Sequence, residues 1–233
     1  MPVHYAVDGP VATLQIDRPD RRNAIDGPTA DALQAHFEAF AADDDARVLI
    51  LAGAGDDAFC AGADLKAFES LAHRSSAAAG FEGFTRLQSP KPTIAAISGW
   101  CVAGGLELAL WADLRVAATG SRFGVLTRRH GLPFIDGGTQ RLPRTIGLPR
   151  ALDLLMTGRE IDAAEAERIG LVNEVVEPGR HLARAAELAM LIASHPPHAL
   201  DADRRAAIKG FGLPLEEGLA VEARVHHLPL EAP

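Results

Sequence analysis

The sequence predicts an α/β fold, with a mixed core over residues 1–178 and a shorter helical region over residues 179–233. Up to Pro178-Gly179, short apolar runs alternate with segments of helical spacing, which is typical of strands and helices packed in layers. From there onward the spacing is helical, with breaks at Pro196-Pro197 and Gly210–Pro214. The length of 233 residues accommodates one large domain with a small appendage.

Six apolar runs predict strands. Val3–Val7 and Val11–Ile16 flank Asp8-Gly9-Pro10, which is a hairpin signal. The others are short continuous runs typical of buried strands, and the Gly/Ala-rich stretch Gly53–Ala63 predicts a long loop. The predicted strands are Val3–Val7, Val11–Ile16, Arg47–Ala52, Thr93–Ile97, Leu114–Ala118 and Leu171–Val176.

Helices are predicted between these strands. Pro28 suits the first turn of Thr29–Ala42, where apolar residues recur at helical spacing. Asp162 is a good N-cap for Ala163–Ile169, and Gly170 a good terminator. The other predicted helices are Asp64–Leu71, Phe81–Gln88, the segment from Gly104-Gly105 through Trp111, Gly137–Ile146 and Pro149–Gly158.

Composition and net charge indicate which kinds of binding partner the protein is poorly suited to bind. The net charge is −8 with no basic block, so nucleic acid and anionic membranes are poor partners. No apolar run reaches the ~20 residues of a membrane span, and the N-terminus lacks a signal-peptide pattern. Cys60 and Cys101 lie in apolar surroundings outside any CxxC pair, as in reduced cytosolic proteins. We therefore expect a cytoplasmic protein.

The most informative stretch is Lys91–Arg115, where an apolar strand leads through glycines into a helix. Gly104 has no side chain at the helix start, so its N–H can face a ligand. Glu107 follows one helical turn later, on roughly the same face, as a single charge in an apolar window. The alternative is that Glu107 only complements the helix dipole.

A second loop of this kind occurs earlier in the chain. Phe59–Lys66, with the sequence FCAGADLK, also places small residues between a predicted buried strand and a helix start. Two such loops can direct two backbone N–H groups at one carbonyl oxygen, which is the arrangement of an oxyanion hole.

Other kinds of site fit the sequence poorly. Gly53-Ala54-Gly55 begins a GxGxxA pattern, but Asp56 and Asp57 would repel a bound pyrophosphate. There is no GxSxG motif, and the histidines lack the spacing of metal ligands. We therefore expect neither a metal nor a bound cofactor.

Several segments together resemble the crotonase (enoyl-CoA hydratase/isomerase) superfamily. They are, in order, DRPDRRNAID, FCAGADLKAF, KPTIAAISGWCVAGGLELALWADLRVA, GGTQRLPRTIG and ALDLLMTGREIDAAEAERIGLVNEVV. The resemblance implies a ββα spiral core, an acyl-CoA thioester substrate with coenzyme A as part of that substrate, and a homotrimer or dimer of trimers. It also implies that the C-terminal helices help to cover CoA and neighbouring subunits, here with a short segment.

The resemblance assigns roles residue by residue. The N–H groups of Ala63 and Gly104 would bind the thioester oxygen, and Glu107 would act as an acid/base. Arg22 and Lys66 would contact CoA phosphates, although both could simply be solvated loop charges. The residues expected to bind substrate or CoA are Arg22, Ala24, Ala61, Asp64, Leu65, Lys66 and Thr127.

One position departs from the family pattern. Hydratases of this superfamily usually have a second glutamate where this chain has Thr127, and a threonine is no general base at neutral pH. Asp136, just before Gly137-Gly138, is a possible substitute; its alternative role is to cap the helix that follows. Enoyl-CoA hydration is the expected reaction and isomerisation the near alternative. A catalytically silent acyl-CoA-binding or RNA-binding protein is the alternative of another class.

Overall fold

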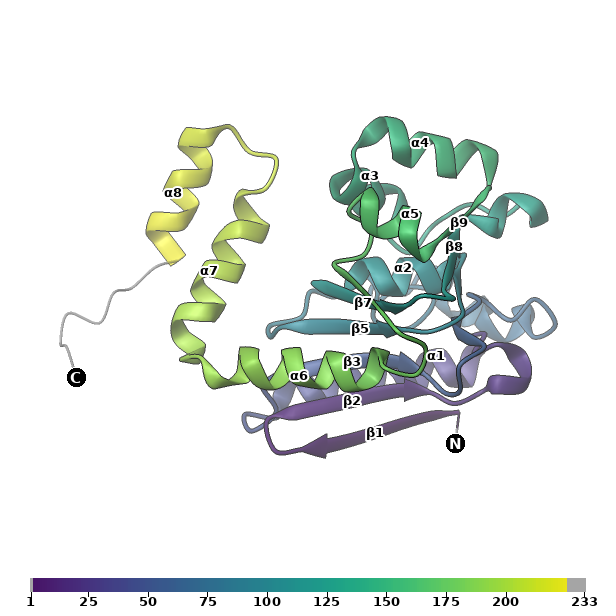
Figure 1. Ribbon diagram of the computed structural model, residues 1–233, viewed down its shortest axis with the longest axis horizontal. Coiled ribbons are helices and arrows are strands. Elements are labelled where there is room, and N and C mark those ends of the chain that lie inside the picture. The colour runs from purple at the N-terminus through teal and green to yellow at the C-terminus, as the bar shows by residue number, and fades with distance from the viewer. Residues whose placement is uncertain (1, 226–233) are drawn as a thin grey trace.

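The computed structural model describes residues 2–225, and its centre is a six-stranded sheet (Figure 1). The first two strands form an antiparallel hairpin and every later neighbour is parallel, in the order β1-β2-β3-β5-β7-β10. The strands are β1 Val3–Asp8, β2 Val11–Ile16, β3 Val48–Gly53, β5 Thr93–Ile97, β7 Leu114–Ala118 and β10 Glu174–Val176. The predicted α/β class is confirmed.

A second sheet, which the sequence analysis did not predict, contains four short strands in the order β4-β6-β8-β9. They are β4 Ala58–Cys60, β6 Trp100–Val102, β8 Arg122–Gly124 and β9 Glu160–Asp162. Along the chain, β4 follows β3, β6 follows β5 and β8 follows β7, and a helical segment comes after each. This repeat of long strand, short strand and helix is the expected ββα spiral.

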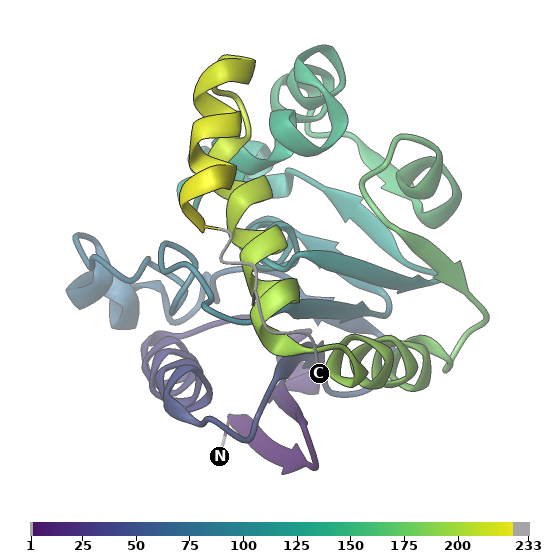
Figure 2. The same cartoon turned by 90° about the vertical axis from the view of Figure 1, so that its left-hand side faces the viewer.

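Eight helices are described, and some of them cover the two sides of the larger sheet. They are α1 Gly27–Ala42, α2 Gly104–Trp111, α3 Gly138–Ile146, α4 Leu148–Thr157, α5 Ala163–Arg168, α6 His181–Ser194, α7 Pro197–Gly210 and α8 Leu215–Val225. Asp26 and Asp162 cap α1 and α5 by accepting N–H groups of the first turn. Figures 1 and 2 show α1 and α6 on opposite faces of the sheet. None of the helices in the described part of the chain is long and apolar enough to cross a membrane.

Both faces of the larger sheet are buried, which explains its continuous apolar strands. In β3, Leu49 and Leu51 belong to the apolar cluster that includes α1 and α2, whereas Val48 and Ile50 belong to the cluster beneath α6. Small residues at every fourth position of α6 let its backbone approach the sheet closely: Ala185, Ala189 and Ala193.

The last two helices stand apart from the sheets. α7 and α8 pack against each other as an antiparallel pair beside the body of the molecule (Figures 1 and 2). Arg204 of α7 ties the pair to the body through an ion pair with Asp113 and a hydrogen bond to the Ser89 carbonyl. Large apolar side chains are exposed on this pair and its connection: Ile208, Phe211, Leu213, Leu215 and Leu219. The predicted C-terminal region also includes residues 226–233, which lie outside the described residues.

Three predicted elements were wrong in type or extent. Phe81–Gln88 is not a helix, because Gly83 has φ +119 and the chain turns repeatedly around it. The helix predicted over Asp64–Leu71 is a 3₁₀ segment, η2, at Phe68–Arg74. The last strand of the sheet begins at Glu174 rather than Leu171.

Candidate active site

The two glycine-rich loops named in the sequence analysis meet in the structure. β4 and β6 pair in parallel, so the loops that follow them emerge side by side. A Cβ added to Gly62 would lie 2.7 Å from the Gly104 nitrogen, so the two backbones touch. Ala103, just before Gly104, has φ +53, an uncommon conformation for a residue with a side chain. The fold therefore brings Ala63 and Gly104 to one place.

A pocket of about 820 Å³ opens beside this contact. Every residue that the sequence analysis assigned to the site lines it: Arg22, Ala24, Ala61, Ala63, Asp64, Leu65, Lys66, Gly104, Glu107, Thr127 and Asp136. The fold therefore gathers residues from separate segments of the chain around one cavity.

Glu107 projects from the first turn of α2 and is 3% exposed. Its Oε1 accepts two backbone N–H groups, from Asp136 at 2.6 Å and Gly138 at 2.8 Å. Burial raises the pKa of Glu107 to about 8, with a further rise from Asp136, while the backbone N–H groups oppose the shift. A carboxyl with this pKa can both accept and release a proton near neutral pH.

The side chain of Asp136 holds a neighbouring loop. Its Oδ1 accepts the N–H of Phe81 at 2.8 Å and its Oδ2 accepts the N–H of Glu82 at 2.7 Å. The capping role considered for it was wrong, because α3 begins after Gly137 without a side-chain cap. Asp136 therefore contributes its backbone N–H to Glu107 and its carboxylate to the loop.

Thr127 lies in a 3₁₀ segment, η3, at Leu126–His130. Its hydroxyl oxygen is buried and has no hydrogen-bond partner among the described residues. An unpartnered hydroxyl lining a cavity is available to a ligand or a water molecule.

The mouth of the pocket carries the predicted CoA contacts. Arg22 and Lys66 are exposed there. Asn23 fixes the first loop, because its side-chain amide donates to the carbonyls of Ala54 and Ala58 at 3.0 and 2.6 Å. Asp64 is held by an ion pair with Arg18 at 3.0 Å. Arg18 was not singled out from the sequence, because its role depends on a residue far along the chain.

Another carboxyl in the pocket also escaped the sequence analysis. Glu82 is 4% exposed, and its Oε2 is buried without a hydrogen-bond partner. Burial raises its pKa well above the usual range, with further rises from Asp136 and Glu107, and a hydrogen bond from the Ala63 N–H opposes them. The segment GFEGF places one acid among glycines and phenylalanines, a pattern that could have indicated a buried carboxyl. We did not identify Glu82 because a helix was predicted over that segment.

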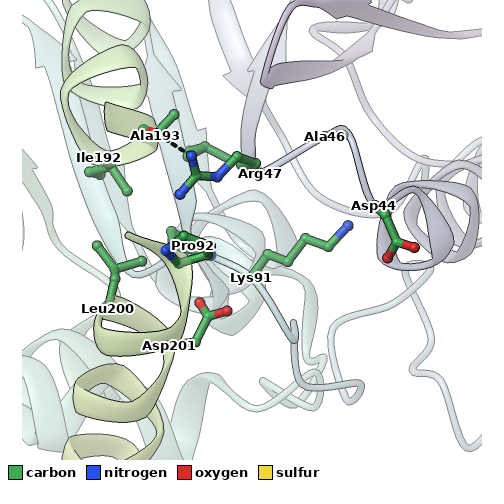
Figure 3. A pocket seen from close by; sticks show the side chains of 11 residues that line it. Asp44, Ala46, Arg47, Lys91, Pro92, Ile192, Ala193, Leu200 and Asp201 are labelled. Atoms are coloured by element: carbon green, nitrogen blue, oxygen red, sulfur yellow. Dashed lines mark hydrogen bonds between the residues drawn. The ribbon is translucent and has the colours of Figure 1, made fainter. Parts of the chain in front are cut away.

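A second pocket, of about 340 Å³, lies at the corner between α6 and α7 (Figure 3). Arg47 donates to the carbonyls of Ala193 and His195 at the end of α6. Lys91 donates to the carbonyls of Phe40 and Asp43 at the end of α1. Both cations therefore satisfy helix C-termini, which is a structural role.

A ββα spiral with two amide-bearing loops above a buried carboxyl defines the crotonase class of protein. The sequence profile described as enoyl-CoA hydratase/isomerase matches residues 7–232. The chain belongs to this family.

Named relatives and solved structures agree. The chain is 38% identical over 222 residues to the (E)-benzylidenesuccinyl-CoA hydratase of Thauera aromatica, covering 94% of this chain and 87% of that protein. It is 36% identical over 220 residues to the short-chain-enoyl-CoA hydratase of Clostridium acetobutylicum, covering 93% and 84%. The crystal structure of an enoyl-CoA hydratase from Bacillus anthracis superimposes with a TM-score of 0.89 at 34% identity, covering 97% of this chain and 89% of that one.

Proposed function

We propose that the protein adds water across the conjugated double bond of an enoyl-CoA thioester. The observation that carries this proposal is the contact between the Ala63 and Gly104 loops beside the buried carboxyl of Glu107. The names of the relatives support the same substrate class, since several are hydratases of CoA thioesters.

The two backbone N–H groups would receive the thioester oxygen. The Ala63 N–H already interacts with an oxygen in the pocket, a carboxyl oxygen of Glu82 that stands in for the substrate's carbonyl oxygen. When water adds to the β carbon, negative charge develops on the thioester oxygen, and fixed N–H donors stabilise it in the transition state. Each such donor typically contributes a few kcal/mol.

Glu107 would accept the proton of the attacking water. Its pKa of about 8 leaves a fraction of the carboxyl ionised at neutral pH, and that fraction is a strong enough base to activate water. The unpartnered Thr127 hydroxyl would orient the same water. Asp136 is a less suitable proton carrier, since both its oxygens already accept backbone N–H groups.

The coenzyme A part would lie over the mouth of the pocket. Arg22 and Lys66 are exposed and free to meet its phosphates. A homotrimer or dimer of trimers would cover the exposed apolar side chains of α7 and α8. Light scattering that shows a stable monomer would contradict this assembly.

The test is hydration of crotonyl-CoA, followed by loss of the conjugated enoyl absorbance. Wild type is expected to turn over, and Glu107→Gln is expected to lose at least about 100-fold in kcat. Glu69→Gln is the matched control, because Glu69 is exposed and does not line the pocket. Absence of wild-type turnover would contradict hydration.

Isomerisation is the second candidate, because Thr127 cannot titrate and one carboxyl suffices to move a proton between two carbons. Supplying a 3-enoyl-CoA and monitoring the appearance of the conjugated product separates the two reactions. Tight binding of CoA thioesters without turnover of either substrate would indicate a catalytically silent protein.

A further inference from the structure

The carboxyl of Glu82 lies where the thioester oxygen is expected. It receives the Ala63 N–H, and a Cβ built on Gly104 would lie 1.9 Å from each of its two carboxyl oxygens. The carboxyl therefore lies against the Cα of Gly104 while it accepts the Ala63 N–H. No feature of secondary structure requires a carboxyl at this place.

Hydrogen bonds distinguish Glu82 from the neighbouring buried carboxyls of Glu107 and Asp136. Asp136 uses both oxygens to hold backbone N–H groups, and Oε1 of Glu107 holds two more. Glu82 has one buried oxygen with no partner. A buried polar atom without a partner is costly unless it has a task.

We propose that Glu82 is the second proton-carrying carboxyl of the site, which delivers a proton to the α carbon of the substrate. This inference rests on the proposed hydration. It supplies the second titratable group that Thr127 cannot provide.

With Glu82 in this role, every proton that moves in the reaction has a donor and an acceptor. Water gives a proton to the Glu107 carboxylate as its oxygen bonds to the β carbon. The π electrons of the double bond move toward the thioester, whose oxygen is held by the Ala63 and Gly104 N–H groups. The Glu82 carboxylic acid next gives its proton to the α carbon and the thioester C=O re-forms. Exchange with solvent water returns a proton to Glu82 and removes one from Glu107.

The charges around Glu82 favour the acid form that this step needs. Burial, followed by the nearby Asp136 and Glu107, raises the pKa of Glu82 well above the usual range. The carboxyl of Glu82 therefore holds its proton until it faces the enolate.

The substrate oxygen must displace Glu82 from the Ala63 N–H and from its place against Gly104. The backbone of the loop stays in place, because Asp136 holds the N–H groups of Phe81 and Glu82. Only the side chain has to rotate, and its reach keeps the carboxyl beside the thioester. The α carbon of the substrate is bonded to the thioester carbonyl carbon. A Glu82 carboxyl that the thioester oxygen displaces therefore lies close to the α carbon.

The experiment compares turnover with binding in one variant. Glu82→Gln is expected to lower kcat for crotonyl-CoA by about 100-fold or more. It should bind butyryl-CoA, a saturated thioester that cannot react, within about threefold of wild type, since the glutamine amide has nearly the same size and still offers an oxygen to the Ala63 N–H. Glu82→Asp should recover part of kcat, and the exposed Glu69→Gln should match wild type in both measurements.

Each other outcome overturns the inference. A kcat within about threefold of wild type for Glu82→Gln would show that the carboxyl carries no proton in the reaction. A loss of kcat matched by weaker butyryl-CoA binding would assign Glu82 to binding or to loop structure. Wild type that does not hydrate any enoyl-CoA would contradict both the proposed function and this inference. If wild type is active, the proposed function stands and the Glu82 variants test only the role of Glu82.

Discussion

Replacing Glu107 by glutamine is expected to remove most of the activity while making the fold more stable. Burial, more than the nearby Asp136, raises the Glu107 pKa from 4.5 to about 8, so the folded protein disfavours the ionised form. The unfolded chain ionises this group freely at neutral pH. Glutamine is uncharged, and its amide oxygen can accept the same two N–H groups from Asp136 and Gly138.

The size of the gain depends on pH. Below pH 4.5 the carboxyl is protonated in both states, so its titration contributes no difference. As the pH rises toward 8, the unfolded chain releases a proton that the folded protein keeps, and wild type loses about 1.4 kcal/mol per pH unit. The accumulated loss is on the order of 3 kcal/mol at pH 7 and becomes constant above the folded pKa. The glutamine variant does not lose this stability.

Urea unfolding of wild type, Glu107→Gln and Glu69→Gln at about pH 5, 7 and 8.5 measures this difference. The free energy of unfolding of Glu107→Gln should rise relative to wild type from the lowest pH to the highest, while the exposed control follows wild type. A difference that does not change with pH would refute the assignment of a buried, proton-retaining Glu107. So would a variant that is destabilised at pH 8.5.

Three further substitutions test other parts of the site and the fold. Asp136→Asn places an amide donor against one of two loop N–H groups, and urea unfolding should show a loss of about 1–3 kcal/mol. Gly62→Ala adds a Cβ 2.7 Å from the Gly104 nitrogen at φ +85, so crotonyl-CoA turnover should fall at least about tenfold with a lower melting temperature; unchanged turnover would contradict the contact of the two loops. Ala189→Leu overfills the contact between α6 and the sheet, and thermal unfolding should show a loss of about 1–3 kcal/mol.

Much of the larger sheet could be predicted, because its strands are continuous apolar runs. β3 and β5 are buried along their whole length, and the sequence expresses this directly. The second sheet could not be predicted, since strands such as Ala58–Cys60 and Trp100–Val102 have three residues each and lie in Gly/Ala-rich loops. Their hydrogen bonds come from strands distant in the sequence.

The site was predictable where local pattern and family resemblance agree. The loops of Ala63 and Gly104 and the carboxyl of Glu107 all line one cavity. The contacts of Asp136 and Glu82 were not predictable, because the two residues interact across 54 positions and the local pattern of Phe81–Gln88 favoured a helix. Gly83, with its positive φ, prevents that helix.

The pairing of β4 with β6 separates the geometry of the two proposed oxyanion donors from the shape of the rest of the pocket. These two strands fix the loops of Ala63 and Gly104 directly, whatever the intervening chain does. That intervening chain leaves after Asp64, lines the pocket through Leu65, Phe68, Ser75, Phe81 and Glu82, and returns through β5. Apart from Glu82, insertions, deletions and substitutions there can reshape the pocket during evolution while the proposed oxyanion donors keep their geometry.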